Sequence, residues 1–442
     1  MSTAVSTAVI GATPAALLAA TRGSVTDLLK PAATGAYRDL RRPKSRTAPA
    51  PVPRTTFDPT VPDNIANPYP ALAQIRQHRV VVNEELGVWM LGRYDDVHAA
   101  ARDSAAFSST DGILLRSFGA SAVIFAQPPD HTRLRRVAAP MFNKRTVAAL
   151  TSDIRELAEA GIAPLRTGDV VDLVQSLTIP MPINVIARML GIPRGTWAEF
   201  RSMSEHFAGI FGPRTTAEII GVIGTGLPAY VRFRVLIAAE MTKRAIEPAD
   251  DLLTRLQTAR AAGELSETEA FVYAFLWLVA GNETTTNLLG MLLLRMAEDP
   301  GLFADLKADR SLIPAAVEET ARWGSPVQWV SRTLTTTRRI GDTVIPRGAR
   351  TLLFYSSANR DPEKFVNADT FDIHRNTTGH LAFGHGLHFC LGAHLARLEV
   401  ATAVEQLLEQ VDGMELAGPV KWATTPSLQG PASLPVRVRR SR

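Results

Sequence analysis

Cys390 is the only cysteine among the 442 residues of the chain. A lone thiol forms no internal disulfide and no multi-cysteine zinc site, so any chemistry it performs is that of one thiolate for a metal ion or a reaction. Most cysteines are instead small, inert core residues. Here, however, Gly386 lies four residues before the cysteine, Gly392 two after it, and Gly384 adds a third glycine. Because glycine allows turns and close approaches that a Cβ would block, the loop predicts a sulfur presented beneath a large flat ligand.

The sequence around this loop predicts the elements that position it. A helix is expected directly after it, from Leu391 to about Leu408, and the positive end of that helix favours a thiolate. Before it, residues 330–356 predict short strands with turns at 341–342 and 346–348.

A second constellation falls on a long helix. Ser266 and Glu269 form a capping-box pattern, and a helix is expected from there to Ala297, about 45 Å in length. Ala280 and Gly281 are small enough to let this helix lie close over a flat ring. A glycine inside a helix is unfavourable by ~1 kcal/mol relative to alanine, which indicates a purpose.

Glu283 and Thr284 follow at once and combine an acid with a hydroxyl group. Such a pair can relay protons by general acid–base chemistry, and the alternative is the polar face of an ordinary helix. Together with Cys390, the pair favours a proton relay over an ordinary polar helix face. The consecutive threonines also predict a local distortion of the helix, because their hydroxyls compete for backbone carbonyls.

Two more pairs have the spacing of neighbours on a helix. Glu319 and Arg322 are i and i+3 on a helix that begins near Pro314, and His131 and Arg135 are i and i+4. An exposed Glu–Arg pair would stabilise a helix by only ~0.3–0.5 kcal/mol. Neither pair indicates a function by itself.

These residues fall into motifs that resemble those of the cytochrome P450 family. Phe383, Gly386, His388, Cys390 and Gly392 match the family's haem-binding signature, Phe-x-x-Gly-x-His/Arg-x-Cys-x-Gly. Four further segments follow the family order. Residues 131–135 resemble the haem-propionate helix of bacterial members, and residues 280–285 resemble the oxygen-activation segment. Residues 319–322 resemble the Glu-x-x-Arg motif, and residues 358–362 with 371–372 resemble the approach to the cysteine loop. The resemblance covers roughly residues 57–438.

The resemblance implies a fold and a cofactor. The fold is mainly α with a minor β region (α+β), a single large triangular-prism helical domain. The cofactor is haem b, iron protoporphyrin IX, held between the long central helix and the cysteine loop. Cys390 is then the iron ligand, and residues 57–442 form the haem-binding monooxygenase domain. Residues 1–56 are rich in Ala, Thr, Pro and Arg and predict a flexible, basic arm in front of it.

The resemblance also gives roles to other residues around the haem. Phe383 shields the sulfur, and the backbone N–H groups of the loop from Gly386 to Gly392 tune it. Ala280 and Gly281 lie against the ring. Cations are expected for the two haem propionates, and the four assigned to them are His131, Arg135, Arg332 and His388.

On the catalytic side, the resemblance makes Glu283 and Thr284 the residues that deliver protons. The Glu319–Arg322 pair is buried in the family, meets a further loop and holds the cysteine region in place. We therefore expect a structural role for this pair, with Glu318 beside it facing solvent.

The substrate pocket is the least specified part of the site, because most of its candidates are equally good core residues. Trp329 and Gln328 stand out, since a bulky indole and an amide could narrow and orient a pocket. The residues to which the resemblance points are Leu114, Phe118, Phe207, Phe211, Leu276, Gln328, Trp329 and Leu428.

Three functions are compatible with these motifs. The first is a haem-thiolate monooxygenase that inserts one oxygen atom from O₂ into an apolar small organic molecule. The second is a haem-binding sensor without turnover, which has no need of the proton relay at Glu283 and Thr284. The third is a haem-thiolate enzyme that uses peroxide, against which the same acid–hydroxyl pair argues.

Composition and charge bound the partners and the location. The chain carries 48 Lys and Arg against 43 Asp and Glu, a net charge of +5, and this modest excess favours an acidic protein partner. We find no nucleic-acid motif, no apolar run long enough to span a bilayer, no secretory signal and no dinucleotide fingerprint. A cytoplasmic monomer that takes electrons from a separate ferredoxin is expected. The cations expected to dock that ferredoxin are Arg133, Arg136, Lys144, Arg145 and Arg397.

The N-terminal part of the predicted domain is expected to contain three features. Residues 69–78 predict a helix, and residues 80–82 with 87–92 predict a pair of strands. Residues 106–127 form a long apolar segment without periodicity, which in a compact domain is usually a functional loop.

Overall fold

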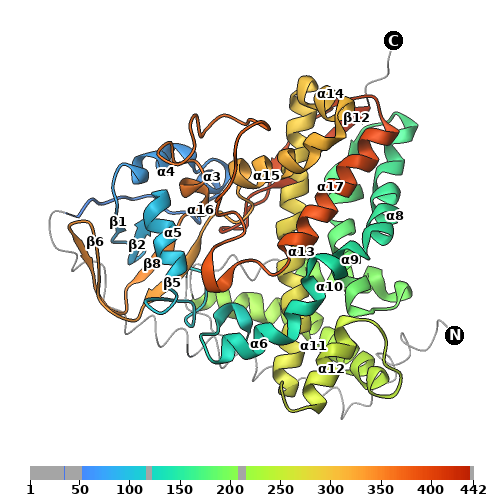
Figure 1. Cartoon of the computed structure of the whole chain (residues 1–442), viewed down its shortest axis with the longest axis horizontal. Coiled ribbons are helices and arrows are strands. Elements are labelled where there is room, and N and C mark those ends of the chain that lie inside the picture. The colour runs from blue at the N-terminus through green and yellow to red at the C-terminus, as the bar shows by residue number, and fades with distance from the viewer. Residues whose placement is uncertain (1–33, 35–51, 116–121, 208–215, 439–442) are drawn as a thin grey trace. The chain divides into compact units, whose positions relative to one another are not determined.

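The computed structural model describes residues 34, 52–115, 122–207 and 216–438 (Figure 1). The predicted arm, residues 1–56, lies almost entirely outside this part of the chain. Contacts between Cα atoms divide the chain into two compact units. We call the first the helical unit, whose described parts fall within residues 110–141 and 183–282, and the second the mixed unit, with described parts in 52–109, 142–182 and 283–438.

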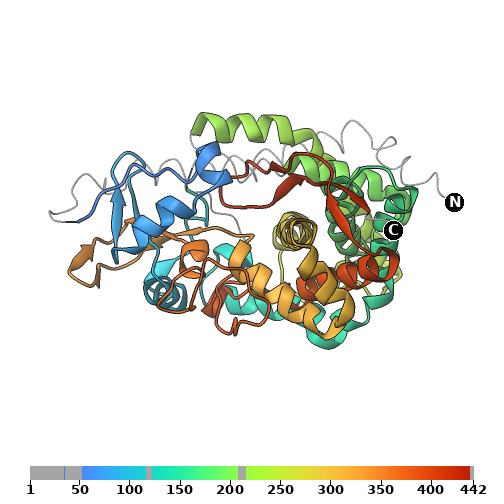
Figure 2. The ribbon, with the colours of Figure 1, turned by 90° about the horizontal axis from the view of Figure 1, so that it is seen from above.

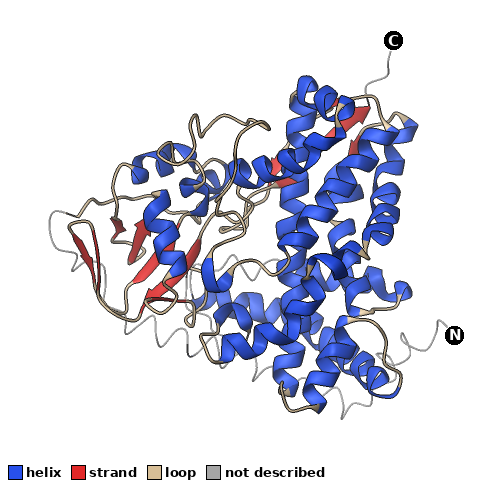
Figure 3. Cartoon of the chain, viewed as in Figure 1, coloured by secondary structure: helices blue, strands red, loops and turns tan. Residues whose placement is uncertain are grey.

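The helical unit contains no strand among its described residues (Figure 3). Its core is aromatic: Phe233 packs against Phe200 and Phe271, with ring centroids 6.0 and 5.6 Å apart, and Tyr230 meets Phe271 edge to face at 5.3 Å. Its elements are η2 (Val123–Phe125), α6 (Asp130–Ala138), most of α9 (Pro180–Leu190), η6 (Arg194–Thr196), α10 (Trp197–Phe207), α11 (Thr216–Ile246), α12 (Leu252–Ala261) and the first half of α13 (Glu267–Glu298).

The long helix α13 confirms the prediction from the capping box. The Ser266 Oγ accepts a hydrogen bond from the Glu269 N–H at 3.2 Å, and the Glu269 carboxylate accepts one from the Ser266 N–H at 2.8 Å. The helix then runs for 32 residues, about 48 Å, and is seen nearly end on in Figure 2. It is α-helical throughout, so the predicted distortion at the threonines is wrong. Thr286 instead donates to the Thr178 carbonyl at 2.7 Å, which leaves the helix's own carbonyls in their ladder.

Every strand of the described chain belongs to the mixed unit. The predicted strand pair is confirmed as the antiparallel β1 and β2, in which Val82 lies opposite Trp89. The largest sheet has the order β1-β2-β8-β5-β3. The turn predicted at 341–342 joins β6 and β7, which form a separate two-stranded sheet, and the turn predicted at 346–348 leads from β7 to β8. The strands are β1 (Val81–Asn83), β2 (Val88–Leu91), β3 (Phe107–Ser108), β4 (Val171–Asp172), β5 (Val330–Leu334), β6 (Arg338–Ile340), β7 (Thr343–Ile345), β8 (Arg350–Leu353), β9 (Met414–Leu416), β10 (Lys421–Trp422), β11 (Pro431–Ser433) and β12 (Pro435–Val438).

The mixed unit also contains helices. α8 and α17 lie side by side (Figure 1) and bury apolar residues such as Ile154 and Val400. The helix predicted after the cysteine is α17, and the one predicted at 69–78 is α4. The helices are α3 (Pro62–Ala66), α4 (Tyr69–Arg76), α5 (Tyr94–Arg102), α7 (Lys144–Ala148), α8 (Thr151–Ile162), α14 (Pro300–Ala308), α15 (Ile313–Gly324), α16 (Tyr355–Ala358) and α17 (Ala393–Gln410); the short turns are η4 (Ala163–Thr167), the π-helical η5 (Val174–Thr178), η8 (Arg310–Leu312) and η9 (Gly386–His388). A further short turn, η3 (Ala139–Phe142), lies mostly in the helical unit and ends at the first residue of the next segment of the mixed unit.

Of the helices within the described ranges, none combines the length and the hydropathy that crossing a bilayer requires.

Candidate active site

The cysteine loop is held by its own backbone. The Cys390 N–H donates to the Phe383 carbonyl at 2.8 Å, and Gly384 and Gly386 both have φ +70°, the left-handed region that glycine adopts without strain. A Cβ at Gly386 would lie 3.0 Å from the Ala101 carbonyl oxygen, so the loop needs glycine there for space as well. The Cys390 side chain is exposed, three residues before the first residue of α17. The sulfur is therefore available to a ligand near a positive helix end.

Gly392 differs from the two glycines before the cysteine. Its φ is −83° and it caps α17, a conformation that other residues can adopt. A Cβ there would meet nothing within 4 Å. The backbone and the protein contacts therefore do not by themselves require glycine at this position.

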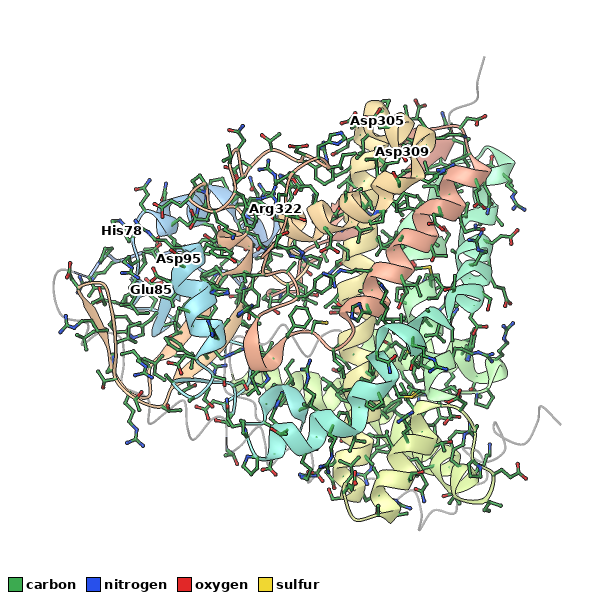
Figure 4. All side chains as sticks on the ribbon, in the orientation of Figure 1. His78, Glu85, Asp95, Asp305, Asp309 and Arg322 are labelled. Carbon is green, nitrogen blue, oxygen red and sulfur yellow. The ribbon has the colours of Figure 1, made fainter. Side chains whose placement is uncertain are left out.

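The Glu319–Arg322 pair is completely buried on α15. Figure 4 labels Arg322. The guanidinium donates to both carboxylate oxygens at 2.7 Å, and its Nη1 also donates to the carbonyls of Asn359 and Ala368. Glu319 in turn accepts from the Asp372 N–H at 2.8 Å. The pair thus ties α15 to the segment that leads into the cysteine loop.

Glu318, the neighbour of this pair, was predicted to face solvent but is only 26% exposed, because its carboxylate is engaged by other side chains. Its carboxylate accepts hydrogen bonds from Arg397 on α17 and from His380, which lies ahead of the cysteine loop. Burial opposes ionisation of Glu318, but the hydrogen bonds from His380 and Arg397 outweigh it and lower its pKa to about 2. Side chains at 318 and 319 point about 100° apart around the helix, so each meets different partners. Glu318 binds Arg397 and His380, whereas Glu319 binds Arg322.

Arg332 lies on β5 and is 4% exposed. Its Nη1 donates to the Ser331 carbonyl at 2.8 Å, and among the described residues no carboxylate is recorded against it. Burial lowers the pKa of Arg332, which the nearby Tyr355 partly offsets. A buried cation of this kind needs an anion, so Arg332 fits a ligand that carries a carboxylate.

Ser109 and Tyr355 both lie close to the loop that leads to the cysteine. The His388 Nε2 lies 3.1 Å from the Ser109 Oγ. The Tyr355 hydroxyl would be 3.8 Å from a Cβ at Gly384, and burial raises the pKa of this tyrosine. With the thiol of Cys390 and the guanidinium of Arg332, the mixed unit fits a metal-bearing, anionic, flat cofactor such as haem.

Glu283 and Thr284 are adjacent half-buried residues of α13 that belong to the mixed unit. The Glu283 Oε2 is buried and has no hydrogen-bond partner among the described residues. Burial raises the pKa of Glu283 to about 7. A carboxyl group with this pKa can both release and take up a proton at neutral pH, as a proton relay requires.

In the helical unit, His131 is 2% exposed on α6 and shares a helix face with Arg135. Burial and the positive charge of Arg135 lower the pKa of His131. Arg133, predicted to face solvent or a partner, is instead 34% exposed and bound to Glu269, with a 2.5 Å contact. Arg136 remains largely exposed, at 68%.

Ala280 and Gly281 occupy the half of α13 that belongs to the helical unit. A Cβ at Gly281 would lie 2.9 Å from the Ile186 Cδ1 of α9. Close packing of α13 against α9 thus also favours a small residue here, and the sequence did not indicate that partner.

The predicted pocket residues lie in different parts of the chain. The side chains of Phe118, Phe207 and Phe211 lie outside the described part of the structure, while Leu114 and Leu276 are half-buried in the helical unit. The others belong to the mixed unit.

Gln328 and Trp329 line a narrow cavity of the mixed unit together with Phe57, Leu72 and Phe354. The Gln328 amide nitrogen donates to the Ser325 carbonyl and to the Gln429 side chain, and residue 327 is bridged to Leu428. These bonds give Gln328 a structural role that its isolated polar character did not reveal.

Asn359 is a functional neighbour that the sequence indicated only through its motif. Its Oδ1 accepts from the Leu381 N–H at 2.6 Å, and its Nδ2 donates to the Ser325 Oγ. It therefore fixes the segment before the cysteine loop. The roles of His380 and Arg397 had no local sequence signal at all.

Comparisons with known proteins agree with this geometry. The sequence profile of the family described as cytochrome P450 matches residues 238–412. Cytochrome P450 107B1 of Saccharopolyspora erythraea is 35% identical over 401 residues, which cover 86% of this chain and 96% of that protein. The beta-dihydromenaquinone-9 omega-hydroxylase of Mycobacterium tuberculosis is 33% identical, with 87% of this chain and 78% of that protein covered.

Solved structures agree as well. Cytochrome P450 CYP109Q5 from Chondromyces apiculatus superposes with a TM-score of 0.78 at 33% sequence identity, over 87% of this chain and 98% of that one.

Proposed function

Because the chain belongs to the cytochrome P450 family of monooxygenases, we propose that Cys390 ligates the iron of its haem b and that an apolar small organic molecule is its substrate. The mainly α fold with small sheets is that of the family. The observation that carries the proposal is the cysteine loop. Two glycines with left-handed backbone angles and the hydrogen bond from the Cys390 N–H to the Phe383 carbonyl hold this loop so that it presents a single exposed thiol.

A haem held by a thiolate supplies the activation of O₂ from which one oxygen atom enters the substrate. The residues of this chain bind and orient that group and handle protons. Arg332 and His388 bind propionate oxygens, with His131 and Arg135 as the further propionate ligands. Buried Arg332 supports this assignment because no protein carboxylate is recorded against it in the described chain.

Glu283 and Thr284 are proposed to deliver protons. The Glu283 Oε2 holds the proton, and the Thr284 hydroxyl passes it on. A pKa of about 7 for Glu283 supports turnover over a sensing role, since a sensor needs no group poised to exchange protons at neutral pH.

The electron donor is proposed to be a separate ferredoxin that meets the protein in the cytoplasm, with the protein a monomer. The exposed Lys144 and Arg145 are candidates to attract it, together with Arg136, which stays 68% exposed although it lies 3.9 Å from the Glu264 carboxylate. Arg133 and Arg397, which we also predicted for this role, are engaged with Glu269 and Glu318.

The proposal is tested by the spectrum of the reduced carbonyl complex, in which a thiolate ligand gives a red-shifted Soret band. We expect Cys390→Ala to lose this band and Cys390→His to give at best an imidazole-type spectrum. His385→Ala, a variant in the same loop that removes no proposed ligand, should keep the band. A thiolate spectrum in either Cys390 variant would refute the ligand assignment.

A further inference from the structure

The ionised side chain of Glu318 connects three segments of the mixed unit. The Arg397 Nε and Nη2 of α17 donate to its two carboxylate oxygens, the second at 3.0 Å. The His380 Nε2 lies 2.9 Å from the same carboxylate. Because the His380 Nδ1 accepts from the Ala382 N–H at 3.2 Å, the ring carries its proton on Nε2 and donates it to Glu318. We call these three side chains the Glu318 clamp.

Phe383 lies directly on this clamp. The Arg397 Cζ is 4.3 Å from the centre of the Phe383 ring, a cation–π distance, and the His380 ring is 5.8 Å from it. The Phe383 carbonyl is the acceptor for the Cys390 N–H. One continuous series of contacts thus leads from Glu318 through Arg397 and Phe383 to the backbone of the cysteine.

From these contacts we propose that Glu318 and Arg397 are positioning residues that hold the cysteine loop in its ligating geometry and balance the charge beside the sulfur. The proposal rests on the proposed function, in which Cys390 is the iron ligand. Neither residue touches the reacting atoms, and both act through Phe383. The role is separate from that of Glu319 and Arg322, whose hydrogen bonds go to a different part of the chain.

The clamp is close to neutral as a whole, because one carboxylate faces one guanidinium and a neutral imidazole. Removing the charge of Glu318 leaves the clamp with an excess positive charge, and removing the charge of Arg397 leaves it with an excess negative charge. Reduction adds an electron to the iron site, so a nearby excess cation favours the reduced form and an excess anion disfavours it. Partial exposure of Glu318 and Arg397, at 26% and 32%, screens but does not abolish this effect.

The test measures the reduction midpoint potential and the thiolate-type fraction of the reduced carbonyl complex. Glu318→Gln should raise the potential, Arg397→Gln should lower it, and the double variant should return close to the wild-type value. Arg397→Lys keeps the charge but not the planar fork that grips a carboxylate and stacks on an aromatic ring. This variant should leave the potential nearly unchanged and lower the thiolate-type fraction.

The control is Glu405→Gln on the same helix, which loses an exposed ion pair with Arg155 and should change neither quantity. Single variants that shift the potential in the same direction, or not at all, would overturn the clamp as a charge-balancing device.

If both charge-removing variants fail to retain haem, Glu318→Asp and Arg397→Lys decide, since an unchanged thiolate fraction in both overturns the positioning role. The failure of the proposed function looks different: Cys390→Ala would then keep the thiolate band of the wild type.

Discussion

Single residues carry the chemistry, and Glu283 shows how much depends on their surroundings. The sequence marked it as an acid next to a threonine, but only burial distinguishes a proton-relay residue from a polar helix face. Its Oε2 has no hydrogen-bond partner in the described chain, and its pKa is raised to about 7. The identity of the residue was predictable, whereas the pKa follows from residues distant in sequence that exclude water.

The raised pKa of Glu283 predicts a pH-dependent stability. The folded protein binds this proton more tightly than the unfolded chain, so ionising Glu283 destabilises the fold as pH rises from about 4.5 to about 7. Glu283→Gln should then be more stable than wild type at pH 8, by at most roughly 3 kcal/mol, and equally stable near pH 4. Denaturant unfolding at both pH values checks this, and a difference that does not change with pH would contradict it.

Thr284→Ala should separate electron consumption from product formation. Without the hydroxyl, we expect the variant to bind haem and substrate but to consume reductant while releasing hydrogen peroxide, with product formation slower by about 10²–10⁴-fold. The assay compares reductant consumed with product formed. Thr284→Ser, which restores the hydroxyl, should recover most of the coupling, and full coupling in the alanine variant would remove Thr284 from the relay.

At the scale of elements, glycines let packed segments approach closely because they have no Cβ. A Cβ at Gly161 of α8 would lie 2.7 Å from the Leu177 Cδ1 and 2.8 Å from the Ser176 carbonyl oxygen. Such contacts join residues that the sequence does not pair, so they could not be predicted. The boundaries of α13 and the turns of the strands could be predicted, because capping boxes and glycines are local signals.

Two glycine substitutions should therefore have opposite effects. Gly161→Ala should destabilise the protein by ~1–3 kcal/mol, because the carbonyl beside it cannot move away without its segment. Gly224→Ala, inside α11 where a Cβ would meet nothing within 4 Å, should stabilise it by ~0.5–1 kcal/mol. Shifts of the chemical unfolding midpoint in the same direction would contradict this account of helix packing.

The buried pair on α15 should be much more sensitive than an exposed pair of equal spacing. Glu319→Gln leaves Arg322 as a fully buried, uncompensated cation, and we expect a loss of ~3–5 kcal/mol and little haem-loaded protein. Glu298→Gln breaks the partly exposed i, i+3 pair with Arg295 and should cost under ~1 kcal/mol. Equal yields of haem-loaded protein from the two variants would refute the structural role of the buried pair.

At the scale of the whole molecule, the excess of basic residues is expected to attract the electron donor. We expect donor-driven reduction to slow as salt rises, because exposed charges are screened over ~8 Å at physiological ionic strength. Arg136→Glu should slow reduction by the ferredoxin but not by dithionite, whereas Arg339→Glu on β6 serves as the charge-reversal control. Donor kinetics that respond to neither salt nor Arg136 would place the docking surface elsewhere.

The family and its motifs could be predicted because each motif is a short run of residues whose types are set by haem chemistry. Glu318 and Arg397 could not be interpreted in this way, since one was expected in solvent and the other at a docking surface. Both are charged residues on helix faces, and nothing local shows that they meet 79 residues apart in sequence. Pairings of this kind need the tertiary structure.

The contact between Gln429 and the start of the mixed unit has a consequence for how the protein is made. The Gln429 Nε2 donates to the Ile65 carbonyl, 364 residues earlier, and the Tyr69 hydroxyl donates to the Gln429 Oε1. On a ribosome, residue 65 emerges long before its partner exists, so this unit cannot close during most of synthesis. Until the later strands are made, β2 lacks its partner β8 and exposes an unpaired edge. We therefore expect the nascent chain to bind chaperones.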